Sequence, residues 1–144
     1  MTSIDQWPKS YISKIYRTYV RSQIQERGKS TSRSNIEPHY TIPIQIHNTA
    51  VTSVSTGLTQ FLSRQKLQDY KNGATIVTHI HGLPPVLILH LQRFEFGGSV
   101  SKVKKEIDYP LSLVMQKEWL SKEIQSSKPI QYKLHAVISH VGHT

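Results

Sequence analysis

The chain has 144 residues, 18 Lys and Arg against nine Asp and Glu, seven Gly and no Cys. Its length predicts one domain or a part of one, and its composition excludes collagen-like, disulfide-rich and wholly disordered chains. Because no Cys is present, the chain cannot by itself be a thiol enzyme or a Cys-ligated zinc protein. It holds no run of about 18 apolar residues and no apolar segment typical of a secretory signal. We therefore expect no membrane association and a cytoplasmic location, with the nucleus as the second option.

The formal net charge of +9 is uneven along the chain. Residues 1–34 contain seven Lys and Arg and two acids, with Tyr11, Tyr16 and Tyr19 between the cations. Cations neutralise phosphates and aromatic rings stack on bases, so such a segment can bind nucleic acid. No nucleic-acid-binding motif accompanies it, so nucleic acid is not the partner we favour. We expect a basic, solvated and partly flexible N-terminal arm over residues 1–34 and a folded unit over residues 35–144.

The first third of the chain gives a mixed pattern of apolar residues. Residues 9–24 fit a helix or paired short strands, whereas residues 25–39 are polar and predict a loop. Residues 41–47 place Ile at every second position, which predicts a half-buried strand. Pro43 lacks a backbone N–H and therefore favours an edge strand or the start of a strand.

A helix and a strand are predicted next. Residues 53–70 repeat apolar side chains at short steps, which predicts an amphipathic helix. Ser53 is a suitable N-cap, and the pattern allows a break near Arg64. Asn72 and Gly73 predict a turn, and the β-branched residues from 74 to 80 predict a strand after it.

The most apolar stretch is residues 86–96, whose front half is continuously apolar. Such a run predicts a central strand buried on both faces. Residues 103–107 alternate, residues 117–121 predict a short helix, and residues 132–139 predict a last strand. Together these elements predict an α+β fold, mainly antiparallel β with a short helical part.

Several blocks, in one order along the chain, carry a family resemblance. Leu83 to Phe94 reads Leu-Pro-Pro-Val-Leu-Ile-Leu-His-Leu-Gln-Arg-Phe. It resembles the Leu-Pro-x-Val-Leu-x-x-His-Leu-Lys-Arg-Phe signature of the ubiquitin-specific proteases. Residues 105–113 and 132–140 resemble the two blocks that follow this signature in that family. Shorter upstream matches resemble the subgroup of ubiquitin-specific protease 10, and they lie at residues 12–16, 21–22, 37–41 and 61–64.

The resemblance implies a papain-like fold in which this chain supplies a fragment of the palm and fingers, with residues 35–144 as a partial catalytic domain. It implies a deubiquitinase, which removes ubiquitin from proteins with a Cys nucleophile, and it implies ubiquitin or ubiquitinated proteins as partners. The family's cysteine box and oxyanion-hole Asn have no counterpart here, and Gln92 replaces the Lys of the signature. We therefore expect this chain alone to be inactive, and no cofactor is implied.

The last residues have two interpretations. Aligned without a gap, His140 and Gly142 match the family's His-x-Gly, and the chain stops before the catalytic His. Aligned with a deleted loop, His143 is the family's general base. The gap-free alignment is favoured because it needs no deletion. In both alignments the Asp or Asn that orients the imidazole is missing, so a catalytic triad is incomplete.

The resemblance also makes Arg93, Phe94 and Glu95 candidates for contacting ubiquitin. The tail of ubiquitin is basic, so acids should recognise it, and Glu106 and Asp108 are the other acids near this block. The structural alternative is that Phe94 packs and that Arg93 holds a loop or a carboxylate.

Two other functions stay open. A non-catalytic pseudoenzyme that binds ubiquitin or another partner would share these sequence features, and a basic nucleic-acid-binding module would use the N-terminal segment. His79 and His81 share one face of a strand, but no further ligands complete a set, so no metal site is predicted. The apolar run at residues 86–91 would lose its cover if the first half of a catalytic domain is gone. We therefore expect poor solubility or oligomers.

Overall fold

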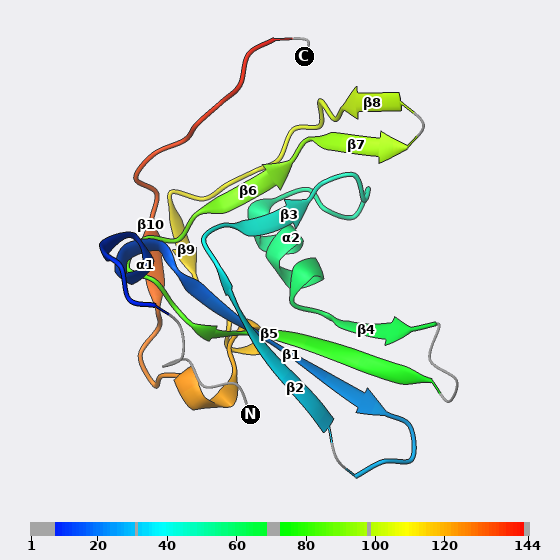
Figure 1. The fold of residues 1–144 in the computed structure, drawn as a ribbon. Coiled ribbons are helices and arrows are strands. Elements are labelled where there is room, and N and C mark those ends of the chain that lie inside the picture. The colour runs from blue at the N-terminus through cyan, green and yellow to red at the C-terminus, as the bar shows by residue number, and fades with distance from the viewer. Residues whose placement is uncertain (1–7, 31, 69–72, 98, 143–144) are drawn as a thin grey trace.

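The longest part of the fold is a four-stranded antiparallel sheet in the order β2-β1-β5-β4. The computed structural model describes residues 8–30, 32–68, 73–97 and 99–142. Figure 1 shows this long sheet reaching away from the rest of the molecule. Its strands, in spatial order, are β2 (Ser32–His39), β1 (Thr18–Glu26), β5 (Ala74–Gly82) and β4 (Arg64–Leu67).

The sheet incorporates the described part of the expected N-terminal arm. A short helix, α1 (Tyr11–Tyr16), leads into β1, which pairs with β2 on one side and β5 on the other. Thr18 and Val20 are buried, and Val20 packs in the hydrophobic core. The boundary expected after residue 34 falls inside β2. Of the loop predicted over residues 25–39, the turn at residues 27–30 is confirmed, whereas residues 32–39 form the edge strand β2, whose mostly exposed side chains tolerate a polar sequence.

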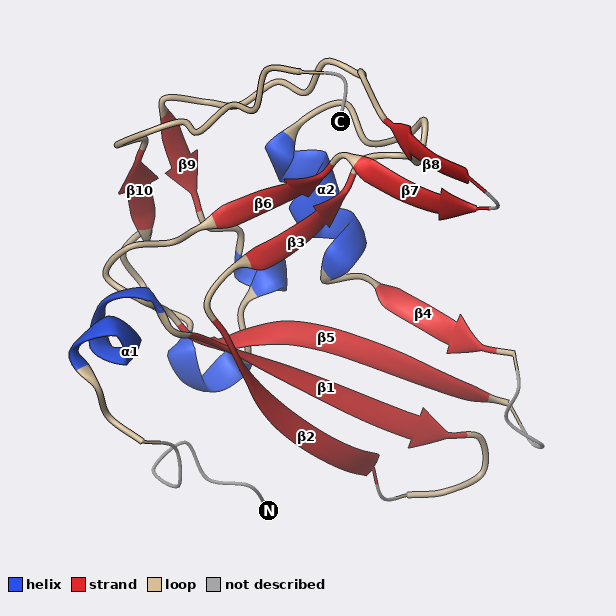
Figure 2. Ribbon diagram, turned by 45° about the horizontal axis from the view of Figure 1, so that its top comes forward, coloured by secondary structure: helices blue, strands red, loops and turns tan. Residues whose placement is uncertain are grey.

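A second layer consists of two parallel strands and a helix (Figure 2). β3 (Ile42–Gln45) pairs with β6 (Leu89–Gln92), and α2 (Val54–Phe61) packs on β3. Ser53 caps α2, because its hydroxyl accepts from the Thr56 backbone N at 3.1 Å while the Thr56 hydroxyl accepts from the Ser53 backbone N at 2.9 Å. The predictions of the cap, of a helix after it and of an edge strand at Pro43 are confirmed. The helix ends at Phe61, before the predicted break, and the chain continues as β4.

The prediction of one buried central strand over residues 86–96 is wrong. β6 ends at Gln92, and a separate strand, β7 (Phe94–Gly97), then pairs with β8 (Ser99–Lys102). Leu89 and Leu91 of β6 are half-buried, whereas His90 is exposed. This alternation arises because β6 has one partner strand and packs on the core through one face.

The last part of the chain forms less regular structure than expected. β9 (Ser112–Val114) pairs with β10 (Gln131–Lys133), so the predicted strand over residues 132–139 forms only at its start. Between them lie two single turns of 3₁₀ helix, η2 (Lys117–Trp119) and η3 (Lys122–Ile124), of which η2 stands where a short helix is predicted. Residues 103–107 form no strand, although Ile107 is buried.

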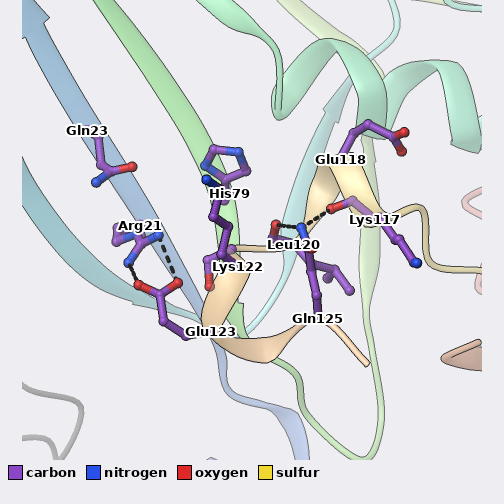
Figure 3. A pocket seen from close by; sticks show the side chains of 10 residues that line it. Arg21, Gln23, His79, Lys117, Glu118, Leu120, Lys122, Glu123 and Gln125 are labelled. Atoms are coloured by element: carbon purple, nitrogen blue, oxygen red, sulfur yellow. Dashed lines mark hydrogen bonds and ion pairs between the residues drawn. The ribbon is translucent and has the colours of Figure 1, made fainter. Parts of the chain in front are cut away.

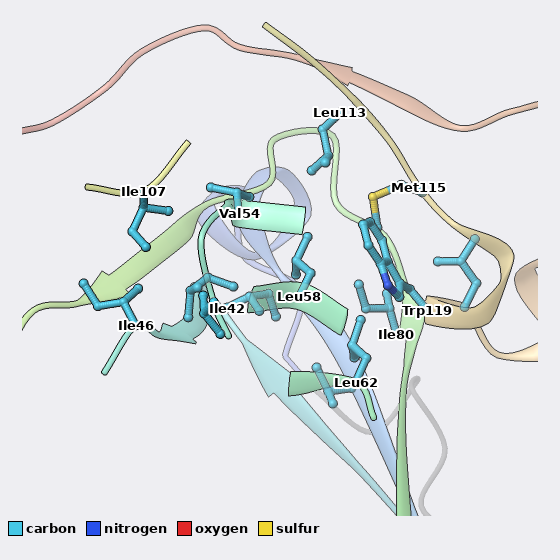
Figure 4. Close-up of a cluster of buried hydrophobic side chains, with 14 residues drawn as sticks. Ile42, Ile46, Val54, Leu58, Leu62, Ile80, Ile107, Leu113, Met115 and Trp119 are labelled. Carbon is cyan, nitrogen blue, oxygen red and sulfur yellow. The ribbon is translucent and has the colours of Figure 1, made fainter. Parts of the chain in front are cut away.

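The hydrophobic core joins these elements around Trp119 (Figure 4). Trp119 is 2% exposed and lies in one cluster with Ile80 from β5 and Leu58 from α2. Its indole Nε1 donates to the hydroxyl of Thr59 at 3.1 Å, so the polar edge of the buried ring is satisfied. Packing in this core therefore holds η2 against both α2 and the long sheet.

Helix α2 approaches β3 so closely that position 57 has room only for Gly. A Cβ built on Gly57 would overlap Cγ2 of Ile44, which is itself fully buried. Gly is a poor helix former, so its presence in the middle of α2 follows from this contact rather than from local preference.

Polar contacts hold η2 and η3 on the long sheet. The Ser121 backbone N donates to Ile80 O at 2.8 Å, and the Ser121 hydroxyl lies 2.8 Å from Nδ1 of His81. Arg21 donates two hydrogen bonds to the Glu123 carboxylate, at 2.6 and 3.1 Å. This pairing holds the pKa of Glu123 at about 2. Burial, and then the charge of Arg21, lower the pKa values of His79 and His81.

One apolar surface is left open to solvent. Val86 and Ile88, just before β6, are 40% and 38% exposed, and Ile12 and Ile15 of α1 are exposed as well. The Val86 backbone N donates to Ile15 O at 3.0 Å, so α1 and this run lie side by side. No helix within the described residues has the length and apolar character needed to cross a bilayer.

Replacing Gly57 tests the close contact between α2 and β3. In an open helix, Gly→Ala stabilises by about 1 kcal/mol. Here we expect Gly57→Ala to destabilise the fold by about 1–3 kcal/mol, because the new methyl group overpacks the core against Ile44. Urea unfolding followed by circular dichroism measures the change. Ser55→Ala in the same helix is the control and should leave stability equal or higher; a stabilising Gly57→Ala would contradict the contact.

The open apolar surface predicts self-association of this chain. We expect light scattering at moderate concentration to show oligomers, because contiguous apolar area is removed from water when copies associate. Replacing Val86 and Ile88 by Ser should shift the population toward monomer, whereas Val114→Ser, at an exposed position on β9, should not. A monodisperse wild-type monomer would count against this prediction.

The two sheet histidines predict a loss of stability in mild acid. The unfolded chain takes up protons near the ordinary pKa of 6.5, whereas the folded chain resists them at His79 and His81. Stability should therefore fall as pH drops below about 6.5. Glu123 stays ionised throughout this range.

Thermal unfolding at pH 7.5 and at pH 5.5 measures this effect. The double variant His79→Gln/His81→Gln should lose less stability between the two pH values than the wild type. His135→Gln, at an exposed position, should keep the wild-type dependence. Equal pH dependence in all three proteins would show that the half-buried His79 and His81 do not carry the effect.

Candidate functional site

Arg93 lies in the short break between β6 and β7 and holds the chain that returns after β8. Its Nη1 donates to Val103 O at 3.2 Å and to Lys105 O at 2.7 Å. The Val103 backbone N donates in turn to Arg93 O at 2.6 Å. The interpretation that Arg93 holds a loop is therefore confirmed. A direct contact of Arg93 with ubiquitin stays a prediction.

Phe94 follows at the start of β7 and presents its ring partly to solvent. It is 44% exposed and lies opposite Lys102 in the β7–β8 ladder. An apolar ring of this size that the chain itself leaves half uncovered is available for contact with a partner. Glu95 is the next residue of β7 and lies opposite Ser101; its side chain is outside the described part of the structure.

The last described residues, 140–142, contact the hairpin formed by β7 and β8. Nζ of Lys102 donates to His140 O at 3.3 Å and to Gly142 O at 2.8 Å. Gly142 has a φ of +148°, which suits a residue without a Cβ. Because Lys102 is the ladder partner of Phe94, the structure brings residues 140–142 near Phe94. His143 lies outside the described residues, so its role as general base stays a prediction.

Lys102 is a site residue that the sequence pattern does not reveal. Its partners are backbone carbonyl groups 38 and 40 positions away, and carbonyl groups leave no residue-type signal. The two other acids near the signature, Glu106 and Asp108, are exposed. Within the described residues neither carboxylate forms an ion pair. They are available to a basic partner.

The described residues contain one His–Ser side-chain contact and no group of metal ligands. Within the described residues, His81 and Ser121 form the one His–Ser side-chain hydrogen bond, but Ser121 is 1% exposed and cannot reach a substrate. Across residues 8–30, 32–68, 73–97 and 99–142, no three His, Asp or Glu side chains gather as ligands for a metal ion. A surface around Arg93, Phe94 and Lys102 is the strongest candidate for recognition.

Comparison with known proteins agrees with the sequence resemblance. The model of the ubiquitin carboxyl-terminal hydrolase family matches residues 3–144. Ubiquitin carboxyl-terminal hydrolase 10 of Gallus gallus is 31% identical over 144 residues, which cover 92% of this chain and 18% of that protein. Ubiquitin carboxyl-terminal hydrolase 24 of Arabidopsis thaliana is 26% identical, and the match covers 99% of this chain and 27% of that protein. The chain thus spans about a fifth to a quarter of the length of these relatives.

Solved structures agree on the fold. The SAGA DUB module of Ubp8, Sgf11, Sus1 and Sgf73 bound to ubiquitin aldehyde contains a chain with a TM-score of 0.82 and 25% identity, covering 95% of this chain and 33% of that one. A second structure of this module gives a TM-score of 0.79 and 27% identity over 94% of this chain and 31% of that one. These matches confirm the predicted α+β, palm-and-fingers type of fold. The chain belongs to the ubiquitin carboxyl-terminal hydrolase family and covers part of a ubiquitin-specific protease domain.

Proposed function

We propose that this chain is the ubiquitin-holding part of a deubiquitinase, an enzyme that removes ubiquitin from proteins by thiol chemistry. The observation that carries the proposal is the fold match, with a TM-score of 0.82 over 95% of the chain, to a module bound to ubiquitin aldehyde. The family match over residues 3–144 supports the same reaction class for the whole enzyme.

The chain's own share of that function is recognition. Thiol hydrolysis needs a thiolate nucleophile and a base within hydrogen-bond reach of it. The 144 residues contain no Cys, and of the family's catalytic groups they offer at most His143 as the base. We therefore expect this chain alone to bind ubiquitin without cleaving ubiquitin conjugates.

We place the contact with ubiquitin at Arg93, Phe94 and Glu95. Phe94 supplies a half-exposed ring, and aromatic side chains are frequent anchors of protein interfaces. Arg93 keeps the start of β7 fixed against residues 103–105, which presents Phe94 in one position. Glu95 is an acid beside it and suits a basic tail. A net charge of +9 gives no long-range attraction to such a tail, so short-range contacts must supply the affinity.

Truncating Phe94 tests this placement. We expect Phe94→Ala to weaken ubiquitin binding about tenfold, corresponding to about 1.4 kcal/mol, because the ring no longer buries apolar area at the interface. Isothermal titration calorimetry with free ubiquitin measures the affinity. Tyr11→Ala is the matched control, since it removes an 86% exposed aromatic ring from α1, far from β7 (Figure 1).

Hydrolysis is measured in parallel with a fluorogenic ubiquitin amide. The wild-type chain should bind ubiquitin, and neither it nor the variants should release the fluorophore. Binding that Phe94→Ala and Tyr11→Ala reduce equally would remove Phe94 from the interface. Turnover by the Cys-free chain would contradict the assignment of recognition alone.

A further inference from the structure

One face of the long sheet forms a polar trough that the proposed ubiquitin contact does not use. Val20 and Ile80 point from the opposite face into the core. On the face that forms the trough, Arg21 of β1 lies opposite His79 of β5. Two residues further along β1, Gln23 lies opposite Val77. Alternate residues of a strand share a face, so Gln25 belongs to this face as well.

Strand β4 adds two cations to the same face. Arg64 lies opposite Val77 and Lys66 lies opposite Thr75 in the ladder with β5. The surface is hollowed along its length. A hollow of about 390 Å³ lies beside η2 and η3, and one of about 220 Å³ lies toward Arg64. The two hollows share Gln23 and His79, so they adjoin on this face and together make up the polar trough. Figure 3 shows the side chains that line the hollow beside η2 and η3.

The charge of the trough is positive. Both carboxylates of the four strands, Glu26 and Glu37, lie on the opposite face, in register with Ala74 and Val20. No other Asp or Glu occurs in the sequences of these four strands. The trough side carries cations from the sheet and from the rim that η2 and η3 supply: Arg21, Arg64, Lys66, Lys117 and Lys122. Among the described residues that line the two hollows, the acids are Glu118 and Glu123 on the rim.

One carboxylate already binds in the trough. Arg21 holds Glu123 through two hydrogen bonds, at 2.6 and 3.1 Å, the fork arrangement that favours carboxylates. The remaining cations form no ion pair within the described part of the chain, and these are Arg64, Lys66, Lys117 and Lys122. Glu123 thus neutralises Arg21, and a ligand with several carboxylates would meet the four cations that form no ion pair in the described part of the chain.

The side chains that line the trough favour a peptide over a nucleic acid. The lining residues include Gln23, Gln25 and Gln125, whose amides can bond a peptide backbone, and apart from the imidazole of His79 they include no Phe, Tyr or Trp ring on which a base could stack. We propose that the polar trough binds an acidic segment of a partner protein. The site contains none of Arg93, Phe94 and Glu95, so this inference goes beyond the proposed function and stands apart from it.

Binding of a fluorescein-labelled deca-glutamate peptide to the full chain tests the proposal. Fluorescence anisotropy at about 0.1 M salt keeps screening near physiological strength. The double variant Arg64→Gln/Lys122→Gln should lower the affinity about fivefold or more, since it removes one cation from each end of the trough. The matched control is Lys128→Gln/Lys133→Gln, which removes the same charge at exposed positions outside the trough.

The outcomes separate the trough from general charge. A fivefold loss in the trough variant with a loss below about twofold in the control supports the proposal. Equal losses, or no binding by the wild type, overturn it. A labelled oligothymidine that binds more tightly than the peptide and depends on the same two residues would overturn it in favour of nucleic acid.

Folding and the ubiquitin site are checked separately. Circular dichroism confirms the fold of each variant, and Lys66→Gln/Lys117→Gln replaces the first variant if that one does not fold. Ubiquitin affinity should be unchanged in the trough variants, so failure of the acidic-peptide site and failure of the ubiquitin site give different results.

Discussion

The burial of Trp119 is the contact on which the arrangement of this chain depends. The ring lies in one cluster with Ile80 from the long sheet and Leu58 from α2, two elements that otherwise meet through few side chains. Burying an aromatic side chain of this size contributes about 1.5–3 kcal/mol or more, a large share of the net stability of a small domain. Without the burial of Trp119, η2 and η3 would not be held on the long sheet, and the residues that they add to the rim of the polar trough would lose their position.

The same core separates two surfaces with different chemistry. The β7–β8 hairpin presents Phe94 beside residues 140–142, whereas the trough on the long sheet presents cations and amides. These are the two surfaces at which we propose recognition by this Cys-free member of the ubiquitin carboxyl-terminal hydrolase family, because recognition needs placed contacts and not a thiolate.

Local signals in the sequence predicted part of this fold. Ser53 with Thr56 forms the cap of α2, and Pro43 marks an edge strand, because both effects act within a few residues. The burial of residues 86–96 could not be predicted from such local signals, because it depends on which faces of this segment other elements cover. The order of the family blocks makes Arg93 and Phe94 candidates for contact with ubiquitin, which stays a prediction. Lys102 and the trough depend on long-range register between strands, and single-sequence periodicity carries no information on that register.

The most direct measurement is an NMR titration of ¹⁵N-labelled ubiquitin with this chain. The account predicts shifts confined to one contiguous surface of ubiquitin together with its C-terminal tail, from a chain that circular dichroism shows to be folded. A folded chain that leaves every ubiquitin signal in place, at concentrations well above those of the calorimetric experiment, would contradict it. That result would leave the family membership intact and remove ubiquitin recognition from these 144 residues.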